Sequence, residues 1–300
     1  MCLDMVSAII TTHNRKELLK RAIESVLSQT YKDMECIVVD DASTDGTGEL
    51  CKSYPIQYIY IPKEKSKGGN YARNLGIKAS SGIYCAFLDD DDYWLPEKIE
   101  KQVALIEEKQ CELVYCGRII EQVFTDSTLF KDCLPDPRWC GDMQKLILQF
   151  ICCTTSTILV SRQALIDAFF FDESLKFWQE YELTIRLAQR QPFYFVNEAL
   201  CVYRVNISDT NRLTNKYFEW RKAVKYIHIK HKNLYKKLTP KEILLSKKLE
   251  WLDAELRCQV SHLTIRKAFY SFLLLPFRVR NFYQTTRYKL LRNINKRVSL

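Results

Sequence analysis

The stretch Tyr84–Trp94 decides the fold, and it reads YCAFLDDDDYW. An apolar run of strand length ends abruptly in four carboxylates, Asp89 to Asp92. Four like charges repel one another, so a folded chain keeps them together only in water or around a cation. Ligands of parallel α/β sheets gather just beyond the carboxyl ends of strands. Hard carboxylate oxygens suit Mg²⁺ or Mn²⁺, and such an ion completes its shell with substrate phosphate oxygens. The alternative is a solvated acidic turn.

The segments before this stretch alternate between strand and helix patterns. Val6–Thr12, Glu35–Val39 and Ile56–Ile61 have the β-branched and apolar character of strands. A helix is predicted over Arg15–Gln29, with Asn14 as its cap. Alternation with such short links predicts an α/β fold in which helices flank a mostly parallel sheet.

Polar side chains gather where three of the predicted strands end. Thr11 and His13 end the first strand, Asp40 and Asp41 end the second, and the aspartate run ends the fourth. We expect them to form one site, because parallel strands end at the same edge of a sheet. No GxGxxG or GxxxxGK[ST] motif occurs, so the dinucleotide fingerprint and the P-loop are excluded. A bound nucleotide would be held by carboxylates, an arginine and a metal.

Composition narrows the class of protein. A chain of 300 residues that is 47% hydrophobic can bury a substantial core. No apolar run reaches the roughly 18 residues of a transmembrane helix, and the N-terminus lacks the pattern of a secretory signal. The 12 cysteines are scattered in apolar surroundings without a CxxC pair. They are interpreted as reduced core thiols of a cytoplasmic protein rather than as disulfides or zinc ligands.

Charge is distributed unevenly along the chain. Residues 212–300 contain 22 Lys and Arg against 5 Asp and Glu, whereas residues 1–211 contain 23 against 31. A mildly acidic body with a strongly basic tail indicates two regions with different partners. We therefore expect a catalytic domain over residues 1–211 and a basic, amphipathic helical region over residues 212–300.

Four motifs together resemble glycosyltransferase family 2. They are ITTHNR at 10–15, VVDDASTD at 38–45, GNYARN at 69–74 and FLDDDD at 87–92, in the order and spacing of that family. The resemblance covers roughly residues 4–210. It implies the GT-A fold and an inverting enzyme that uses a nucleotide sugar.

The resemblance also implies which residues bind the nucleoside of the donor. Thr11 and His13 match positions that flank the base, and the flat imidazole of His13 can stack on a pyrimidine. Asp40 matches the carboxylate that accepts a hydrogen bond from the base N–H, which favours uracil or thymine over cytosine. Asp41 is expected near the same pocket.

The resemblance assigns the phosphates and the metal to residues further along. Arg73 matches a contact to the phosphate region, where a guanidinium suits the charge. Asp89 and Asp91 match the Asp-x-Asp motif, with Asp91 as the direct metal ligand and Asp89 nearer the ribose. Asp90 matches a contact to the sugar of the nucleotide. Arg204 is either a structural residue or a further phosphate contact.

An inverting transfer needs a base that takes the proton of the acceptor hydroxyl. The family places it in a Glu-Asp pair just before a helix, and here the pair is Gln179-Glu180. The resemblance therefore implies Glu180, one methylene longer than aspartate, as the catalytic base. Glu182 stays an alternative. Both acids can also be solvated residues that favour the first turn of the helix.

The basic C-terminal region is predicted to be helical, with one long helix over Lys241–Val260. Its stretch 265–300 combines aromatic and leucine residues with basic flanks, which suits a helix lying on an anionic membrane surface. The alternative is a helical extension that packs on the catalytic domain.

We expect an inverting, metal-dependent hexosyltransferase that uses a nucleotide sugar, with a UDP-sugar as the expected donor. The acceptor is a hydroxyl of a growing cell-surface glycan or glycolipid, at the cytoplasmic face of the membrane. A nucleic-acid-binding protein that acts through its basic tail is the alternative. That alternative leaves the acidic strand ends without a purpose, and an acidic body repels phosphate backbones, so no nucleic-acid partner is expected.

Overall fold

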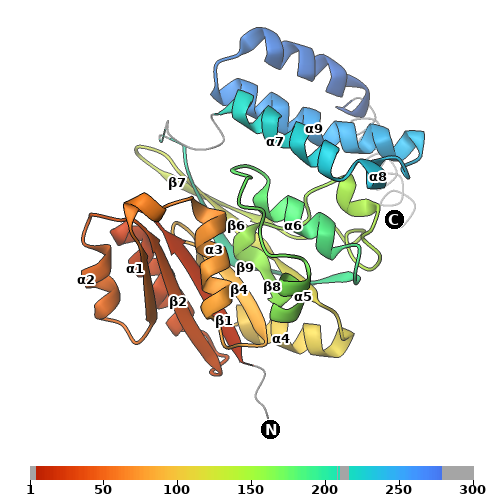
Figure 1. Ribbon diagram of the computed structural model, residues 1–300. Coiled ribbons are helices and arrows are strands. Elements are labelled where there is room, and N and C mark those ends of the chain that lie inside the picture. Colours follow the sequence, from red (N-terminus) through yellow and green to blue (C-terminus); the bar gives the residue numbers. More distant parts are fainter. Residues whose placement is uncertain (1–4, 208, 210–215, 279–300) are drawn as a thin grey trace, which may run out of the picture.

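Figure 1 shows the computed structural model, which describes residues 5–207, 209 and 216–278. Within these residues the centre of the molecule is a sheet in the order β3-β2-β1-β4-β8-β6-β9-β5, and β7 pairs with β6. The strands are β1 (Val6–Thr12), β2 (Met34–Asp41), β3 (Gln57–Ile61), β4 (Tyr84–Asp89), β5 (Tyr93–Trp94), β6 (Leu113–Val123), β7 (Thr128–Cys133), β8 (Ile158–Ser161) and β9 (Phe193–Asn206).

The sheet is mostly parallel, as predicted. Strands β3, β2, β1 and β4 run in one direction. Strand β8 is antiparallel to both β4 and β6, so β6 again runs parallel to β4, and β9 runs parallel to β6. The carboxyl ends of β1, β2, β4, β6 and β9 therefore point to the same edge of the sheet.

Helices cover both faces of this sheet (Figure 1). They are α1 (Lys16–Leu27), α2 (Thr47–Lys52), α3 (Gly69–Ala79), α4 (Lys98–Lys109), α5 (Arg162–Asp167), α6 (Gln179–Leu187), α7 (Tyr217–Lys230), α8 (Lys232–Tyr235) and α9 (Pro240–Val260). Ile10 of β1 belongs to a hydrophobic cluster with residues of α1 and α4. Its neighbour Ile9 belongs to a cluster with residues of α3, α5 and α6, because successive strand side chains point to opposite faces.

The helices after residue 216 pack on the catalytic body rather than standing apart from it. Trp220 of α7 and Cys258 of α9 are fully buried in the same hydrophobic cluster as Leu183 of α6. A further helix begins at residue 264 and continues to the last described residue of this region, and it buries Leu274. Independent folding of the two predicted domains stays a prediction. The part of stretch 265–300 beyond residue 278 lies outside the described residues.

The predicted cap of the first helix is wrong. Asn14 has φ +52°, and its side-chain oxygen accepts the N–H of Thr44 instead of a helix N–H. Asp45 satisfies the start of α1 by accepting the N–H of Lys16 at 2.9 Å. Asn14 therefore ties the β1–α1 loop to the β2–α2 loop, which fixes two walls of the site described below.

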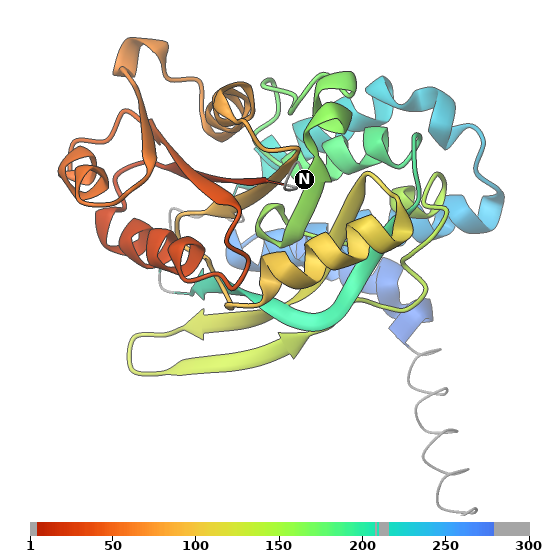
Figure 2. The same ribbon diagram turned by 90° about the horizontal axis from the view of Figure 1, so that it is seen from below.

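Two other expectations from the sequence can be compared with the described residues. The cysteines that the structure describes are all unpaired, and most of them are buried, in agreement with the prediction of core thiols. None of the described helices has the length and apolar character that crossing a bilayer requires. The sequence did not reveal the β6–β7 hairpin, which projects as an arm beside the sheet (Figure 2).

Candidate active site

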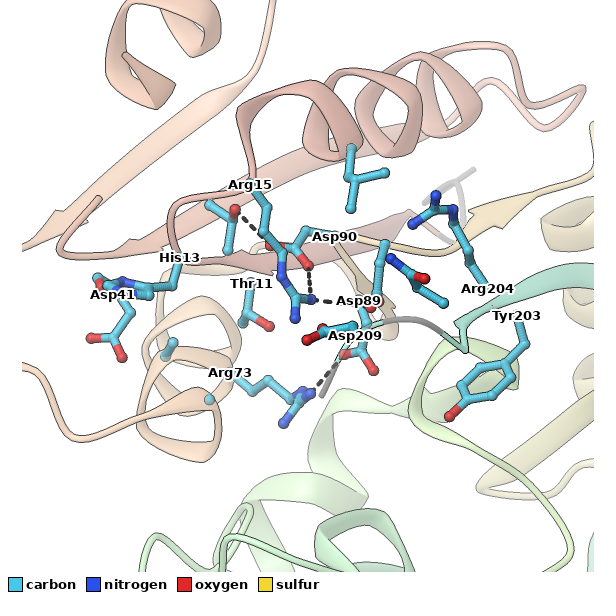
Figure 3. A pocket seen from close by; sticks show the side chains of 16 residues that line it. Thr11, His13, Arg15, Asp41, Arg73, Asp89, Asp90, Tyr203, Arg204 and Asp209 are labelled. Atoms are coloured by element: carbon cyan, nitrogen blue, oxygen red, sulfur yellow. Dashed lines mark hydrogen bonds and ion pairs between the residues drawn. The ribbon is translucent and has the colours of Figure 1, made fainter. Parts of the chain in front are cut away.

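A cleft of about 580 Å³ opens at the edge of the sheet where the parallel strands end (Figure 3). Its lining brings together most of the residues predicted from the sequence: Thr11, His13, Asp41, Arg73, Asp89, Asp90, Asp91 and Arg204. Figure 3 shows His13 and Asp41 at one end of the cleft and Tyr203 and Arg204 at the other. Arg15, Arg73 and the aspartates lie between the two ends. The expectation that separate strand ends form one site is therefore met.

Asp41 presents an unsatisfied acceptor at its end of the cleft. Its Oδ2 accepts the backbone N–H of Gly68 at 3.2 Å. Its Oδ1 is buried and has no hydrogen-bond partner among the described residues. A buried, unpaired carboxylate oxygen is unfavourable by roughly 1–3 kcal/mol or more, so its presence indicates a donor supplied by a ligand.

The ring of His13 is oriented beside this carboxylate. Its Nδ1 lies 2.5 Å from the backbone carbonyl oxygen of Asp41, and its other nitrogen lies 3.2 Å from Nδ2 of Asn14. These contacts suit a neutral ring that donates from Nδ1 and accepts at Nε2. They hold an exposed, flat ring at the mouth of the cleft.

Asp40 does not occupy the place expected of it. Its side chain is only 1% exposed and is not part of the cleft lining. One oxygen accepts the hydroxyl of Tyr58 at 2.7 Å, and the other accepts the N–H of Ser43 at 2.9 Å. Because both oxygens are used inside the protein, Asp40 supports the β2–α2 turn. Of the two adjacent aspartates, Asp41 is the one that lines the cleft.

Two arginines neutralise the acidic run in the middle of the cleft. Arg73 donates to Asp89 at 2.6 Å and is itself held by Asn70 and by Gln179 of α6. Arg15 donates to both Asp90 and Asp91 at 3.0 Å. The sequence reasoning missed Arg15, although it stands in the ITTHNR motif, because nothing in the sequence shows that the β1–α1 loop folds over the aspartates.

The four aspartates differ in environment. Asp90 accepts the hydroxyl of Thr12 at 2.8 Å, and burial raises its pKa to about 6 although Arg15 opposes this shift. Asp92 is buried, and burial raises its pKa as well. It accepts the hydroxyl of Ser156 at 2.6 Å and the backbone N–H of Arg204 at 2.9 Å. Asp92 therefore anchors the end of β9.

The remaining two aspartates fit a hard divalent cation. The side chains of Asp89 and Asp91 are each 33% exposed, and both line the cleft. Oδ2 of Asp89 accepts no hydrogen bond within the described residues. The described part of the chain contains no cluster of three or more His, Cys, Asp or Glu ligands. Two carboxylates without a protein cage suit Mg²⁺ or Mn²⁺, which binds with water and substrate phosphates as its other ligands.

Glu180 is the second residue of α6, whose first residue, Gln179, accepts a hydrogen bond from Arg73. It does not line the 580 Å³ cleft itself, but the charges of Arg73 and Asp89 both reach it. Its carboxylate has no side-chain hydrogen bond within the described residues. Burial raises its pKa, and the positive charges of Arg73 and Arg118 offset this only in part. A raised pKa and an unpaired carboxylate suit a general base.

Glu182 has the opposite character. It is completely buried and is bound by Arg186 at 2.8 Å, Lys230 at 2.8 Å and His231 at 2.9 Å. Burial alone would raise its pKa, but the hydrogen bonds from His231 and Arg186 outweigh burial and lower the pKa to about 2. A carboxylate held in this way cannot meet a substrate hydroxyl, so the geometry leaves Glu180 as the candidate base.

Arg204 lines the cleft at the end of β9, and its Nε lies 3.8 Å from Glu121. Its backbone is held by Asp92. Both roles expected of it, structural and phosphate-contacting, are compatible with this position.

Comparison with other proteins agrees with the site. The sequence profile described as Glycosyl transferase family 2 matches residues 7–169. An uncharacterised glycosyltransferase of Rickettsia typhi is 32% identical over 250 residues, which cover 81% of this chain and 75% of the relative. A second relative is the Escherichia coli UDP-Glc:alpha-D-GlcNAc-diphosphoundecaprenol beta-1,3-glucosyltransferase WfaP. It is 39% identical over 129 residues, which cover 43% of this chain and 51% of WfaP.

Solved structures resemble this chain in fold. S. aureus TarS 1–349 in complex with UDP-GlcNAc superposes with a TM-score of 0.57 at 16% identity, covering 91% of each chain. The mannosyltransferase PcManGT of Pyrobaculum calidifontis, in complex with GDP-Man and Mn²⁺, gives a TM-score of 0.55 at 17% identity. That match covers 93% of this chain and 84% of the other. The chain is a glycosyltransferase that belongs to glycosyl transferase family 2 and has the GT-A fold.

Proposed function

We propose that this glycosyltransferase transfers a hexose, with inversion, from a UDP-sugar to a hydroxyl of a lipid-linked cell-surface glycan. The observation that carries the proposal is the buried, unpaired Oδ1 of Asp41 at one end of a cleft whose middle holds Arg15, Arg73, Asp89 and Asp91. These groups follow the order of the parts of a nucleoside diphosphate. The carboxylate of Asp41 can accept the N–H of the nucleobase, and the arginines and metal-binding aspartates can hold the phosphates.

The nucleoside end of the cleft favours uracil. Asp41 accepts but cannot donate when it is ionised, so it pairs with the N3–H of uracil or thymine, whereas N3 of cytosine carries no hydrogen. Thr11 and the fixed ring of His13 flank the same place. A UDP-sugar donor also agrees with the activity for which WfaP is named and with the ligand of TarS, whereas PcManGT was solved with GDP-Man.

The diphosphate would lie over the middle of the cleft. Asp89 and Asp91 would hold a divalent cation there, and when bound the cation neutralises charge on the departing diphosphate. Arg15 and Arg73 pair with these aspartates in the structure. Each guanidinium has further N–H groups that can donate to phosphate oxygens from the same position.

Glu180 would act from the opposite side of the sugar. As the acceptor oxygen forms its bond to C1, its proton passes to the Glu180 carboxylate, and the bond from C1 to the diphosphate oxygen breaks with both electrons leaving on the nucleotide. Attack opposite the leaving group inverts the configuration at C1. The carboxylate is available for this step because no other side chain occupies it within the described residues.

The acceptor is proposed to be a glycan on a lipid diphosphate. WfaP, to which 43% of this chain is similar, is named for its action on GlcNAc-diphosphoundecaprenol. Such an acceptor places the reaction at a membrane surface. Because the nucleotide sugar is cytoplasmic, this surface is the cytoplasmic face of the membrane.

A membrane-facing surface is available on the last described helix. Its exposed apolar side chains recur at helical spacing and are Ile265, Phe269, Phe272 and Leu275. Arg266 and Lys267 flank them. An apolar helix face with basic neighbours suits the interface of an anionic leaflet, so we assign the enzyme to the inner face of the membrane as a peripheral protein.

Nucleotide binding tests the central claim. UDP should bind the parent protein at least about tenfold more tightly than CDP, the affinity difference that one well-placed hydrogen bond gives. Asp41→Ala should remove this preference and weaken UDP, whereas Asp167→Ala, on the short helix α5, should change neither. Equal affinity of the parent for UDP and CDP would contradict the proposal.

A further inference from the structure

Arg118 of β6 has no carboxylate partner within the described residues. It forms no ion pair or hydrogen bond within the described residues, and its Nε is buried without a partner. Within the described residues its guanidinium carbon lies 5.4 Å from the centroid of the Tyr203 ring. The other arginines of the site, Arg15 and Arg73, are paired with aspartates. A partly buried, unpaired guanidinium is costly, which indicates a site for an anion.

The pairing between β6 and β9 is irregular beside this side chain, because β9 carries extra residues opposite Gly117. The register between β6 and β9 shifts on both sides of Gly117. A Cβ at this glycine would lie 2.9 Å from the carbonyl oxygen of Glu198 and 3.0 Å from that of Cys133, so only glycine fits between the two neighbouring strands. Bulges of this kind redirect side chains and are frequent beside active sites.

The consequence for Arg118 follows from strand alternation. Beyond the bulge, Glu121 pairs with Arg21 of α1, so it faces the α1 side of the sheet. Arg118 lies three residues earlier and therefore faces the opposite side, which α6 covers. In agreement, the charge of Arg118 acts on Glu180 at the start of α6.

The register also places Arg118 at the height of the acidic run. Cys85 of β4 and Leu113 of β6 are both opposite Val160 of β8. Asp90 and Arg118 each lie five residues further along these parallel strands. Strand β8 begins only at Ile158, and the turn Thr155–Thr157 that precedes it contacts both β4 and β6.

We propose that Arg118 forms an anion subsite for the acceptor, and that this subsite binds a phosphate of the diphosphate that carries the acceptor sugar. This inference rests on the proposed function. In a sugar diphosphate, the phosphate is attached to the same sugar ring that carries the reacting hydroxyl. Arg118, whose charge reaches Glu180, can therefore bind the phosphate while Glu180 takes the proton of the hydroxyl.

The position favours the acceptor over the donor as the source of this phosphate. Arg118 does not line the 580 Å³ cleft, in which Arg15, Arg73 and Arg204 already serve the donor end. It lies instead on the side of Glu180, from which the acceptor must approach. Tyr203 stands between the two regions, since it lines the cleft and also stacks on Arg118.

Binding of two matched acceptor probes to the full-length protein tests the subsite. One probe is octyl GlcNAc diphosphate, and the other is the uncharged octyl GlcNAc glycoside; both are titrated calorimetrically with UDP present in saturating amounts. The parent should bind the diphosphate probe at least about tenfold more tightly than the glycoside, as a charge-assisted bidentate contact allows. Arg118→Gln should abolish the difference, and Arg118→Lys should keep part of it. Arg190→Gln makes the same chemical change at the other end of β6, where Arg190 pairs with Glu112, and should leave the difference intact.

Three results would overturn the inference. These are equal binding of both probes by the parent, an equal weakening of both probes in Arg118→Gln, and a loss of UDP affinity in Arg118→Gln as large as the loss of affinity for the diphosphate probe. The last result would assign Arg118 to the donor. These experiments measure binding, so their outcome does not depend on turnover. The proposed function is tested separately, and it fails if the enzyme turns over no UDP-hexose.

Discussion

The indole nitrogen of Trp178 donates a hydrogen bond to Asp253, 2.8 Å away, and this bond joins the start of α6 to α9. Trp178 has φ +53°, a left-handed conformation that is unfavourable by roughly 1–2 kcal/mol for a residue with a side chain. It also packs edge-on against Trp220 of α7 at 5.5 Å. The C-terminal helices therefore hold the backbone immediately before Gln179 and Glu180 in place.

This contact predicts that Asp253 positions Glu180, the proposed catalytic base. Asp253→Ala should lower the turnover number about tenfold, because Glu180 loses its fixed position, while the affinity for UDP stays unchanged. Asp253→Asn should restore most of the rate, since the amide oxygen still accepts from the indole. Glu255→Ala is the matched control, because Glu255 lies on the same helix but binds Ser271 and Arg278 instead of α6. An equal loss in Glu255→Ala would mean that only the packing of α9 matters.

Glu180→Gln should separate chemistry from binding. The amide keeps the shape of the carboxylate but cannot take a proton, so transfer should fall by about 10²–10⁴-fold while UDP affinity survives. Because burial raises the pKa of Glu180, the parent rate should fall as pH decreases through that raised pKa, at a higher pH than for an ordinary glutamate. Steady-state rates between pH 5 and 8 measure both effects. Near-normal transfer by the variant would exclude Glu180 as the base.

The regular part of the fold could be predicted from the sequence because it follows hydrophobic periodicity. Val6–Thr12 was predicted as a strand and is β1, and the helix predicted over Lys241–Val260 is α9, which begins one residue earlier at Pro240. The family motifs likewise identified most of the residues that line the cleft.

The parts that could not be predicted depend on contacts between distant segments. Asp40 and Asp41 are adjacent in sequence, and only the hydroxyl of Tyr58 on the next strand shows which one is withdrawn from the cleft. Arg118 has the pattern of an ordinary strand residue, and the sequence does not show that the register between β6 and β9 shifts beside it. Periodicity assigns faces only while a strand stays regular, so it fails at such positions.

Glu182→Gln should lower the free energy of unfolding. Breaking a buried ion pair is unfavourable by roughly 3–5 kcal/mol, because Arg186 and Lys230 would lose their partner. The lowered pKa of Glu182, about 2, means that its contribution is present above the pKa of an unfolded glutamate and is lost as pH falls toward 2. The free energy of unfolding of the parent should therefore decline between about pH 4.5 and 2 more steeply than that of the variant. Denaturant titrations at several pH values would show this, and an unchanged unfolding free energy at pH 7 would contradict it.

Asp91→Ala should remove the part of UDP binding that depends on Mn²⁺ while leaving the fold intact. Asp91 lines the cleft and is 33% exposed, so its loss creates no buried cavity. Calorimetric titration of UDP with and without Mn²⁺ measures the difference, and circular dichroism checks the fold. Asp126→Ala, on the loop between β6 and β7, is the control. A variant that still gains as much UDP affinity from Mn²⁺ as the parent would show that the metal is held elsewhere.

The last prediction concerns the membrane surface on the helix after residue 264. Deleting this helix is a poor test, because Leu274 is 1% exposed and the hydroxyl of Tyr270 contacts that of Tyr217, so deletion would open the core. Substitution of its outward residues Phe269 and Phe272 by Ser leaves those contacts in place. The double variant should bind anionic vesicles at least about tenfold more weakly, since each phenylalanine that enters the interface contributes up to about 2 kcal/mol.

The same vesicle experiment separates apolar from electrostatic binding. Each basic residue near an anionic leaflet contributes roughly 1 kcal/mol, and this part should weaken as salt shortens the Debye length toward about 8 Å. Transfer to a soluble acceptor should not change in the double variant, because these side chains are remote from Glu180 in sequence and exposed. Phe130→Ser with Phe169→Ser removes two exposed phenylalanines, one from β7 and one from the turn after α5, and should leave vesicle binding intact. If the parent ignores anionic vesicles even at low salt, the surface serves another purpose.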